Sequence, residues 1–121
     1  MLLKDISFVI PVFNRPNEID ELLNSFCLQK ESKDFEIVII EDGSSNKCDK
    51  IIKNYKNLNI SYYYKDNSGP GDSRNFGMNK AKGSYFIILD SDIILPENYC
   101  TILIDNLSKN FSECFGGVDD S

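Results

Sequence analysis

The stretch SRNFGMNKAKGSYFIILDSD, residues 73–92, contains one complete step from a helix to a strand. Residues 73–82 predict a helix, and Gly83 is expected to end it. Residues 84–90 form an apolar and aromatic run that is typical of a buried strand. The run stops at Asp90 and Asp92, which are separated by a single serine. Two carboxyl groups at the end of a buried strand indicate a turn, a helix cap or half of a metal site.

The same alternation of strand and helix continues on the N-terminal and C-terminal sides of this stretch. Residues 5–12, 34–42 and 58–65 predict strands, and residues 113–118 are expected to start a fifth. Helices are expected over residues 15–29, 46–55 and 96–110, and a loop over 66–73. Asn14 and Pro16 suit the start of the first helix. The short connections predict an α/β fold, with a mostly parallel sheet that has helices on both faces.

The length and the end of the chain bear on its domain organisation. With 121 residues, the chain is long enough for one domain and too short for two. We therefore expect a single domain over residues 1–121. The sequence ends in GGVDDS, without a closing helix or a polar tail, so we expect a truncated fold that is the front part of a longer protein.

The composition argues against several functional classes. The net charge of −6 disfavours a nucleic-acid partner, which would require a basic surface. The chain has no histidine, which excludes Ser-His and Cys-His nucleophile schemes within it. Its four cysteines lack C-x-x-C spacing and are expected to be reduced, mostly buried thiols. Neither a signal peptide nor an apolar run of membrane-spanning length is visible, so a cytoplasmic location is expected.

Polar residues gather where the predicted strands end, and ligands of open parallel sheets bind beyond those ends. The candidate site residues are Pro11, Phe13 and Asn14 after the first strand, Glu41 and Asp42 after the second, Arg74 after the glycine-bearing loop, and Asp90 and Asp92 after the fourth. Carboxyl groups placed so close together need a cation or hydrogen-bond donors. Paired Asp side chains suit Mg²⁺ or Mn²⁺, with a phosphate completing the ligand shell and an arginine pairing with that phosphate.

Each motif also has a simpler structural interpretation when it is taken alone. The segment EDGSS, residues 41–45, fits a turn in which Ser44 or Ser45 caps the next helix. The segment NSGPGDS, residues 67–73, lacks the G-K-[ST] ending of a phosphate loop and fits a plain mobile loop. Arg74 fits a helix surface. Taken together and in this order, the motifs favour a ligand site over these alternatives.

The chain resembles the nucleotide-sugar-binding half of family 2 glycosyltransferases, which have the GT-A fold. The resemblance is carried by FVIPVFN (residues 8–14), IVIIEDGSS (residues 37–45) and NSGPGDSRNFGMNKAKGSYFIILDSD (residues 67–92). Each motif alone is weakly specific, but their order and spacing together are specific. The match covers nearly the whole chain.

The resemblance implies roles for the residues on the nucleotide side of the site. Pro11, Phe13 and Asn14 would line the nucleotide pocket. Asp42 matches the acid that accepts a hydrogen bond from an N–H of the base. Glu41 would also belong to the nucleotide site, at a position where many members carry Asp.

On the phosphate side, the resemblance implies that Arg74 lies near the base or the pyrophosphate, although Ser73 replaces the usual Ala. Asp92 would be the direct ligand of Mn²⁺ or Mg²⁺. Asp90 would contact the ribose, or the metal through water. A metal that bridges the pyrophosphate would stabilise the charge of the leaving nucleoside diphosphate.

The implied activity is an inverting transfer of a sugar from a UDP-sugar to a hydroxyl of a glycan, a lipid carrier or a protein, in cell-surface polysaccharide biosynthesis. The catalytic base of the family lies well beyond the D-x-D motif, so we expect it beyond Ser121. These 121 residues alone are then expected to be inactive. Membrane association, at the inner face, is expected only through the rest of the parent protein.

Two other classes fit the sequence less well. A nucleotidyltransferase would need a Gly-rich phosphate loop with basic residues after the first strand, where Arg15 is the only basic residue. A non-enzymatic phosphoacceptor domain would need acids after the first strand and a key Asp after the third. The first strand instead leads to Asn14, and the third runs into Lys65 and Asp66.

Overall fold

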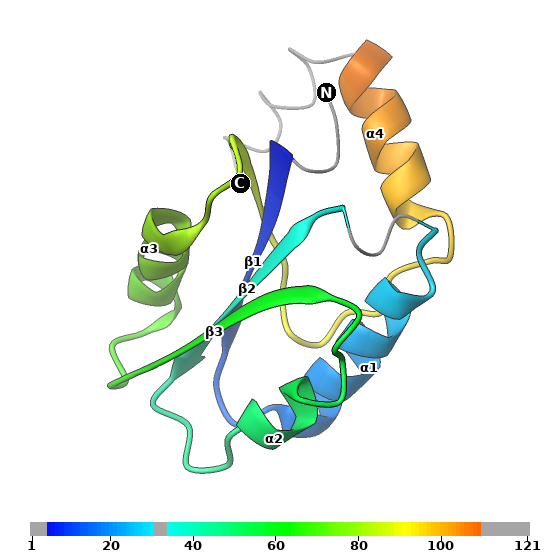
Figure 1. Cartoon of the computed structure of the whole chain (residues 1–121). Coiled ribbons are helices and arrows are strands. Elements are labelled where there is room, and N and C mark those ends of the chain that lie inside the picture. Colours follow the sequence, from blue (N-terminus) through cyan, green and yellow to red (C-terminus); the bar gives the residue numbers. More distant parts are fainter. Residues whose placement is uncertain (1–4, 31–33, 110–121) are drawn as a thin grey trace.

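The computed structural model describes residues 5–30 and 34–109, which form one sheet with helices packed against it (Figure 1). In chain order, the elements are β1 (Ile6–Val12), α1 (Pro16–Cys27), β2 (Glu36–Asp42), α2 (Asp49–Ile52), β3 (Asn59–Lys65), α3 (Pro70–Lys80), β4 (Tyr85–Ile88) and α4 (Tyr99–Lys109). This alternation confirms the predicted one, while the strand predicted over residues 113–118 lies outside the described residues. No described helix is long and apolar enough to cross a membrane.

The strands pair in the order β3-β2-β1-β4, and all three pairings are parallel. Val9 in the central strand β1 lies opposite Val38 of β2 and Ile88 of β4. The predicted parallel sheet is therefore confirmed. Because the strands all run in one direction, their carboxyl ends meet on one side of the molecule, which is the lower side in Figure 1.

Helices cover both faces of the sheet, because successive residues of a strand point to opposite faces. On one face, the ring of Phe8 contacts the rings of Phe26 in α1 and Phe35 before β2, with centroids 5.1 and 5.2 Å away. Residues of α4 join this larger core. On the other face, α3 covers a smaller core that includes Val9 and Ile40.

The helix α3 begins at Pro70, three residues before the predicted start. Gly69 is its N-cap, with a φ of 100°, and Pro70 occupies its first turn. Proline suits this position because its φ is already helical and its missing N–H would have no partner in the helix. The predicted loop over residues 66–73 is correspondingly shorter, and Arg74 lies within the helix rather than at its start.

The helix α2 is much shorter than the predicted helix over residues 46–55, and residues 46–48 precede it in a turn that side chains hold. The N–H of Asn46 donates to Asn14 Oδ1, and that of Cys48 donates to Glu41 Oε1. The N-cap is Cys48, without a side-chain cap bond. The interpretation of Ser44 or Ser45 as a cap is therefore wrong.

Gly83 does not end α3, contrary to the prediction. The helix ends at Lys80, and the following Ala81 is extended. A Cβ on Gly83 would lie 2.6 Å from Ser7 Oγ and 2.8 Å from the carbonyl oxygen of Asp5, so only glycine fits here. The N–H of Gly83 donates to Ser7 Oγ at 2.9 Å, which ties the start of β4 to the start of β1.

None of the described cysteines is joined in a disulfide. Cys48 and Cys100 are buried, and Cys27 is half-buried. Cys114 lies outside the described residues.

Gly77 of α3 sets how closely this helix approaches the sheet. A Cβ at this position would lie 2.4 Å from Val9 Cγ1 and 3.2 Å from Ile40 Cγ1. We expect Gly77→Ala to lower the free energy of unfolding by about 1–3 kcal/mol, because the helix must move away from the β-branched side chains beneath it. Urea denaturation monitored by circular dichroism measures this change.

The matched control is Gly71→Ala in the same helix, where an added Cβ meets nothing within 4 Å. Alanine there should be neutral or stabilising by up to about 1 kcal/mol. Equal destabilisation by both variants would contradict close packing at Gly77 as the cause.

Candidate functional site

Two adjoining pockets lie at the carboxyl ends of the strands. The first, called the Phe13 pocket, has a volume of 320 Å³ and is lined by Pro11, Val12, Phe13, Asp42, Asn67, Gly69 and Pro70. The second, called the Asp92 pocket, has a volume of 410 Å³ and is lined by Pro11, Arg15, Pro70, Arg74, Ile88, Asp90, Ser91 and Asp92. Pro11 and Pro70 line both, so the two pockets share a wall made by β1 and the start of α3.

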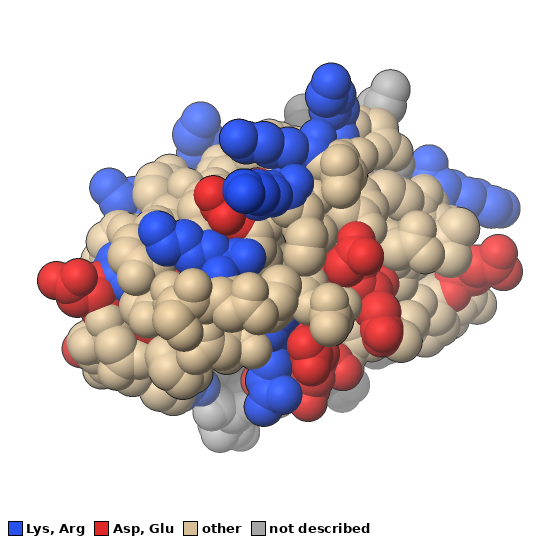
Figure 2. Space-filling model, turned by 90° about the horizontal axis from the view of Figure 1, so that it is seen from below, with Lys and Arg blue, Asp and Glu red and all other residues tan. Residues whose placement is uncertain are grey.

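The charge around these strand ends is mixed. Figure 2 looks at the molecule from the side on which the strands end, and there Asp and Glu side chains lie close to Lys and Arg side chains. Neither sign covers the whole face. A ligand with both anionic and hydrogen-bond donor groups can find partners of both kinds here.

Asp42, the last residue of β2, is held by three donors. Its Oδ1 accepts hydrogen bonds from Lys65 Nζ at 2.7 Å and from the N–H of Ser68 at 2.9 Å. Its Oδ2 accepts from the N–H of Gly69 at 3.0 Å. The side chain of Asp42 is nearly buried, so these bonds fix the loop between β3 and α3 against the end of β2.

These donors determine the charge of Asp42 and the number of further hydrogen bonds that it can accept. Burial alone would raise the pKa of Asp42, but the hydrogen bond and charge of Lys65, with the N–H groups of Ser68 and Gly69, outweigh it and lower the pKa. A carboxylate has about four acceptor positions, so three bonds leave one for a ligand in the Phe13 pocket. Asp42 can therefore accept one further hydrogen bond there.

Asn14 fixes the turn that follows β1. It has a φ of 53°, in the left-handed region that asparagine tolerates better than most other non-glycine residues. Its N–H donates to Ser44 Oγ at 2.8 Å, and its Oδ1 accepts from the N–H of Asn46 at 2.9 Å. Asn14 does not cap α1, whose N-cap is Arg15, so this part of the predicted helix start is wrong. The turn leaves the preceding Phe13 51% exposed on the pocket wall.

Glu41 is completely buried and points to the opposite face of β2 from Asp42. Its Oε2 accepts from Ser44 Oγ at 2.5 Å. Its Oε1 accepts from the N–H of Cys48 at 2.8 Å, from the Cys48 thiol at 3.3 Å and from the Tyr62 hydroxyl at 2.9 Å. Burial and the adjoining Glu41 raise the pKa of Cys48 and that of Tyr62, so both groups remain protonated donors at neutral pH.

The Asp92 pocket combines two carboxyl groups with two guanidinium groups. Asp90 and Asp92 follow β4 and are both exposed. Arg74 donates from Nε to the carbonyl of Pro70 at 3.3 Å, and Arg15 lies 3.5 Å from Glu18. Both arginines therefore line the pocket without an ion pair to either aspartate among the described contacts.

The metal prediction rests on Asp90 and Asp92 alone. No group of three or more possible metal-binding side chains occurs within residues 5–30 and 34–109. Two carboxylates still fit Mg²⁺ or Mn²⁺, which are commonly held by one or two carboxylates together with water and substrate phosphates. The residues present therefore suit a metal that binds together with a phosphate ligand.

The structure brings most of the predicted site residues to the two pockets. Those that line a pocket are Pro11, Phe13, Asp42, Arg74, Asp90 and Asp92. Asn14 and Glu41 lie behind the pocket wall and are absent from both linings. Sequence reasoning did not assign Arg15, Asn67 or Pro70 to the site; the loop and helix boundaries that place them became clear only in the folded chain.

The fold and the two pockets define an α/β domain with a hydrogen-bonding pocket beside a charged one, both at the carboxyl ends of its parallel strands. A family model described as glycosyl transferase family 2 matches residues 7–119. The chain belongs to this family, which confirms the resemblance seen in its motifs.

Several curated proteins are similar to the chain. An uncharacterized glycosyltransferase of Rickettsia bellii (strain RML369-C) is 34% identical over 106 residues, which cover 87% of this chain and 15% of that protein. Poly(ribitol-phosphate) beta-N-acetylglucosaminyltransferase TarS of Staphylococcus aureus (strain Mu50 / ATCC 700699) is 34% identical over 90 residues, covering 71% of this chain and 16% of TarS. The chain thus spans well under a third of the length of these two relatives.

Solved structures show the same fold. The structure of S. aureus TarS 1-349 in complex with UDP-GlcNAc has a TM-score of 0.81 and 29% identity, covering 88% of this chain and 32% of that one. The mannosyltransferase PcManGT from Pyrobaculum calidifontis, in complex with GDP-Man and Mn²⁺, has a TM-score of 0.77 and 18% identity, covering 85% of this chain and 32% of that one. The predicted GT-A fold is confirmed.

Asp42 gives a pH-dependent prediction. Because its pKa lies below the ordinary value of 3.8, its ionised form stabilises the fold above that value, and this contribution is lost as the pH falls through the lowered pKa. We expect Asp42→Asn to lower the free energy of unfolding by about 1–3 kcal/mol at pH 7. The difference from wild type should shrink below pH 3.8, as measured by urea denaturation at a series of pH values.

The control is Asp66→Asn, which removes an exposed carboxyl group from the same loop without touching the three bonds to Asp42. That variant should differ little from wild type across the same range. A pH-independent difference for Asp42→Asn would contradict the role given to its ionised form.

Proposed function

We propose that the chain forms the donor-binding half of a metal-dependent, inverting glycosyltransferase that takes its sugar from a UDP-sugar. One observation carries the proposal: the pocket lined by Asp42 adjoins the pocket lined by Asp90, Asp92 and two arginines. A nucleoside diphosphate has this same sequence of groups, with a hydrogen-bonding ring at one end and a charged diphosphate at the other.

The uracil ring is assigned to the Phe13 pocket. Phe13 and Pro11 offer apolar surface against which a flat ring can pack. The remaining acceptor position of Asp42 suits the ring N–H, and a nearly buried carboxylate disfavours a ring that presents no donor. Binding of UDP by the similar TarS 1-349, at 27% identity and a TM-score of 0.81, supports this assignment.

The diphosphate and the metal are assigned to the Asp92 pocket. Asp92 would ligate Mn²⁺ or Mg²⁺ directly, and Asp90 would contact the ribose or the metal through water. A bound divalent metal would offset the charge of the leaving diphosphate. Arg74 and Arg15 are placed to donate to phosphate oxygens from the same pocket.

The transfer itself breaks the bond between the sugar and the diphosphate and forms a bond from the sugar to an acceptor oxygen, whose proton passes to a general base. Because Asp90 and Asp92 are assigned to the ribose and the metal, we place this base outside the two pockets. The acceptor is proposed to be a hydroxyl of a glycan, lipid carrier or protein. The similar TarS is named a poly(ribitol-phosphate) beta-N-acetylglucosaminyltransferase, which favours a role in cell-surface polysaccharide synthesis for the parent protein.

The metal assignment predicts metal-dependent nucleotide binding. Titration calorimetry with UDP should show tighter binding in the presence of Mn²⁺ than in the presence of a chelator. Asp92→Ala should weaken UDP binding in Mn²⁺ at least about tenfold, since the cation loses its carboxylate ligand. The same variant should bind UDP equally with and without the metal.

The control is Asp72→Ala, which removes an exposed carboxyl group of α3 that lines neither pocket. It should keep the wild-type response to Mn²⁺. The metal assignment is wrong if a chelator leaves UDP binding by the wild type unchanged and Asp92→Ala binds UDP as tightly as the wild type does.

The role of Asp42 predicts selectivity for the base. UDP should bind roughly 10-fold or more tightly than CDP, because N3 of cytosine has no hydrogen and would face the carboxylate without a bond. Competition calorimetry with the two nucleotides measures the ratio. Phe13→Ala, which leaves Asp42 in place, should weaken the binding of both nucleotides and leave the ratio of their affinities unchanged. Equal affinities of the wild type for UDP and CDP would exclude Asp42 as the group that selects the base.

A further inference from the structure

We infer that Glu41 is a positioning residue of the nucleotide pocket, which acts on Phe13 through Ser44 and Asn14. The inference rests on the proposed function, because the pocket it shapes is the one assigned to the uracil ring. It gives a role to the one acidic residue of the predicted site that is completely buried.

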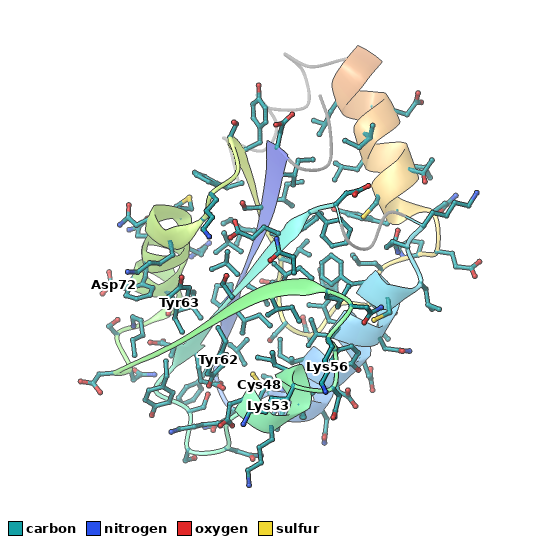
Figure 3. The ribbon with its side chains drawn as sticks, in the orientation of Figure 1. Cys48, Lys53, Lys56, Tyr62, Tyr63 and Asp72 are labelled. Carbon is teal, nitrogen blue, oxygen red and sulfur yellow. The ribbon has the colours of Figure 1, made fainter. Side chains whose placement is uncertain are left out.

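Glu41 accepts hydrogen bonds from three separate segments of the chain. Ser44 belongs to the turn after β2, Cys48 is the N-cap of α2, and Tyr62 lies in the middle of β3. Figure 3 shows Cys48 and Tyr62 next to each other between β3 and α2. The carboxyl group thus joins the loop over residues 43–48 to the sheet from behind the Phe13 pocket.

Ser44 connects Glu41 to the neighbouring loop after β1. Its hydroxyl is buried and can donate only one hydrogen bond, which goes to Glu41 Oε2. Its oxygen is thereby oriented to accept the N–H of Asn14 at 2.8 Å. The chain of contacts runs from β2 to the turn after β1, across 30 residues of sequence.

The turn that receives this bond carries the pocket wall. Asn14 adopts its left-handed φ of 53° directly after Phe13, whose side chain is 51% exposed. A ring with so few neighbours is positioned mainly by its backbone. Without the Ser44 bond, the turn would keep only the hydrogen bonds that the Asn14 side chain accepts from Ser45 and Asn46. The backbone of Asn14 would be less restrained, and Phe13 could then move relative to Asp42.

Direct contact of Glu41 with a nucleotide does not fit its surroundings. Glu41 lines neither pocket, and four hydrogen-bond donors of the protein already face its oxygens. The pocket wall beside it is formed by Asp42, which points the other way from the strand. The side chain can influence the ligand only through the groups it holds.

The experiment compares UDP binding by Glu41→Gln and Ser44→Ala with binding by the wild type. Glutamine offers an acceptor oxygen on only one side of the group, and alanine at position 44 removes the relay while leaving the other donors of Glu41. Each variant should raise the Kd for UDP roughly 5- to 30-fold. The Kd of the double variant for UDP should be only slightly higher than that of the single variant that binds UDP less tightly, because both changes break the same chain of contacts.

The matched control is Glu36→Gln. Glu36 is a buried carboxyl group at the other end of β2, where it accepts from Ser7 Oγ and from the N–H of Lys82. Its substitution should lower stability in urea without changing the Kd for UDP. A Phe13→Ala background supplies a second control: Glu41→Gln should add little there, because the ring that it positions is gone.

A measurement without nucleotide tests the relay separately. Hydrogen exchange of the Asn14 amide should accelerate in Glu41→Gln and Ser44→Ala, and should stay unchanged in Glu36→Gln. Failure of the wild type to bind UDP would overturn the proposed function. The exchange rates alone would then show whether Glu41 acts on Asn14 through Ser44. Unchanged exchange at Asn14, or a wild-type Kd for UDP in both variants, would overturn the inference.

Discussion

The three hydrogen bonds to Asp42 hold the site together. They join the end of β2 to the loop after β3 and so determine where α3 begins, since Gly69, which donates one of them, is also the N-cap of that helix. The next residue, Pro70, lines both pockets together with Pro11. A carboxylate that was expected to serve only the ligand therefore also builds the pocket in which the ligand would lie.

Strand alternation explains why two adjacent acids have different surroundings. Asp42 faces the loop after β3 and the Phe13 pocket, whereas Glu41 faces Ser44, Cys48 and Tyr62. A strand turns successive side chains to opposite faces, so the pair cannot share one partner. One acid is available to a ligand, and the other is enclosed by donors of the protein.

Close packing of α3 against the sheet supports the same site, on the face of the sheet to which Asp42 points. Gly77 allows the helix to lie directly on Val9 and Ile40, and Gly83 allows the chain to pass Ser7 as it enters β4. The helix is thereby held at a fixed height above β1 and β2. Arg74, one turn before Gly77, consequently reaches the same pocket as the aspartates that follow β4.

The sequence by itself determined the order of strands and helices, the parallel sheet and the edge at which the functional groups would gather. Hydrophobic periodicity and the rule that parallel strands end together are local or topological, so one chain is enough to apply them. Asp42, Asp90 and Asp92 could be placed at that edge for the same reason. The family motifs added their expected roles.

Only the tertiary structure decided which of these residues face a pocket and where the helices begin. Side chains of Asn14 and Glu41 accept hydrogen bonds from N–H groups in the turn before α2, and these contacts join residues 7 to 32 positions apart. Gly83 was expected to end a helix, but it is required by the approach of a strand 76 positions away. Hydrogen bonds and steric contacts between distant segments leave no periodic pattern in the sequence, which is why the fold alone reveals them.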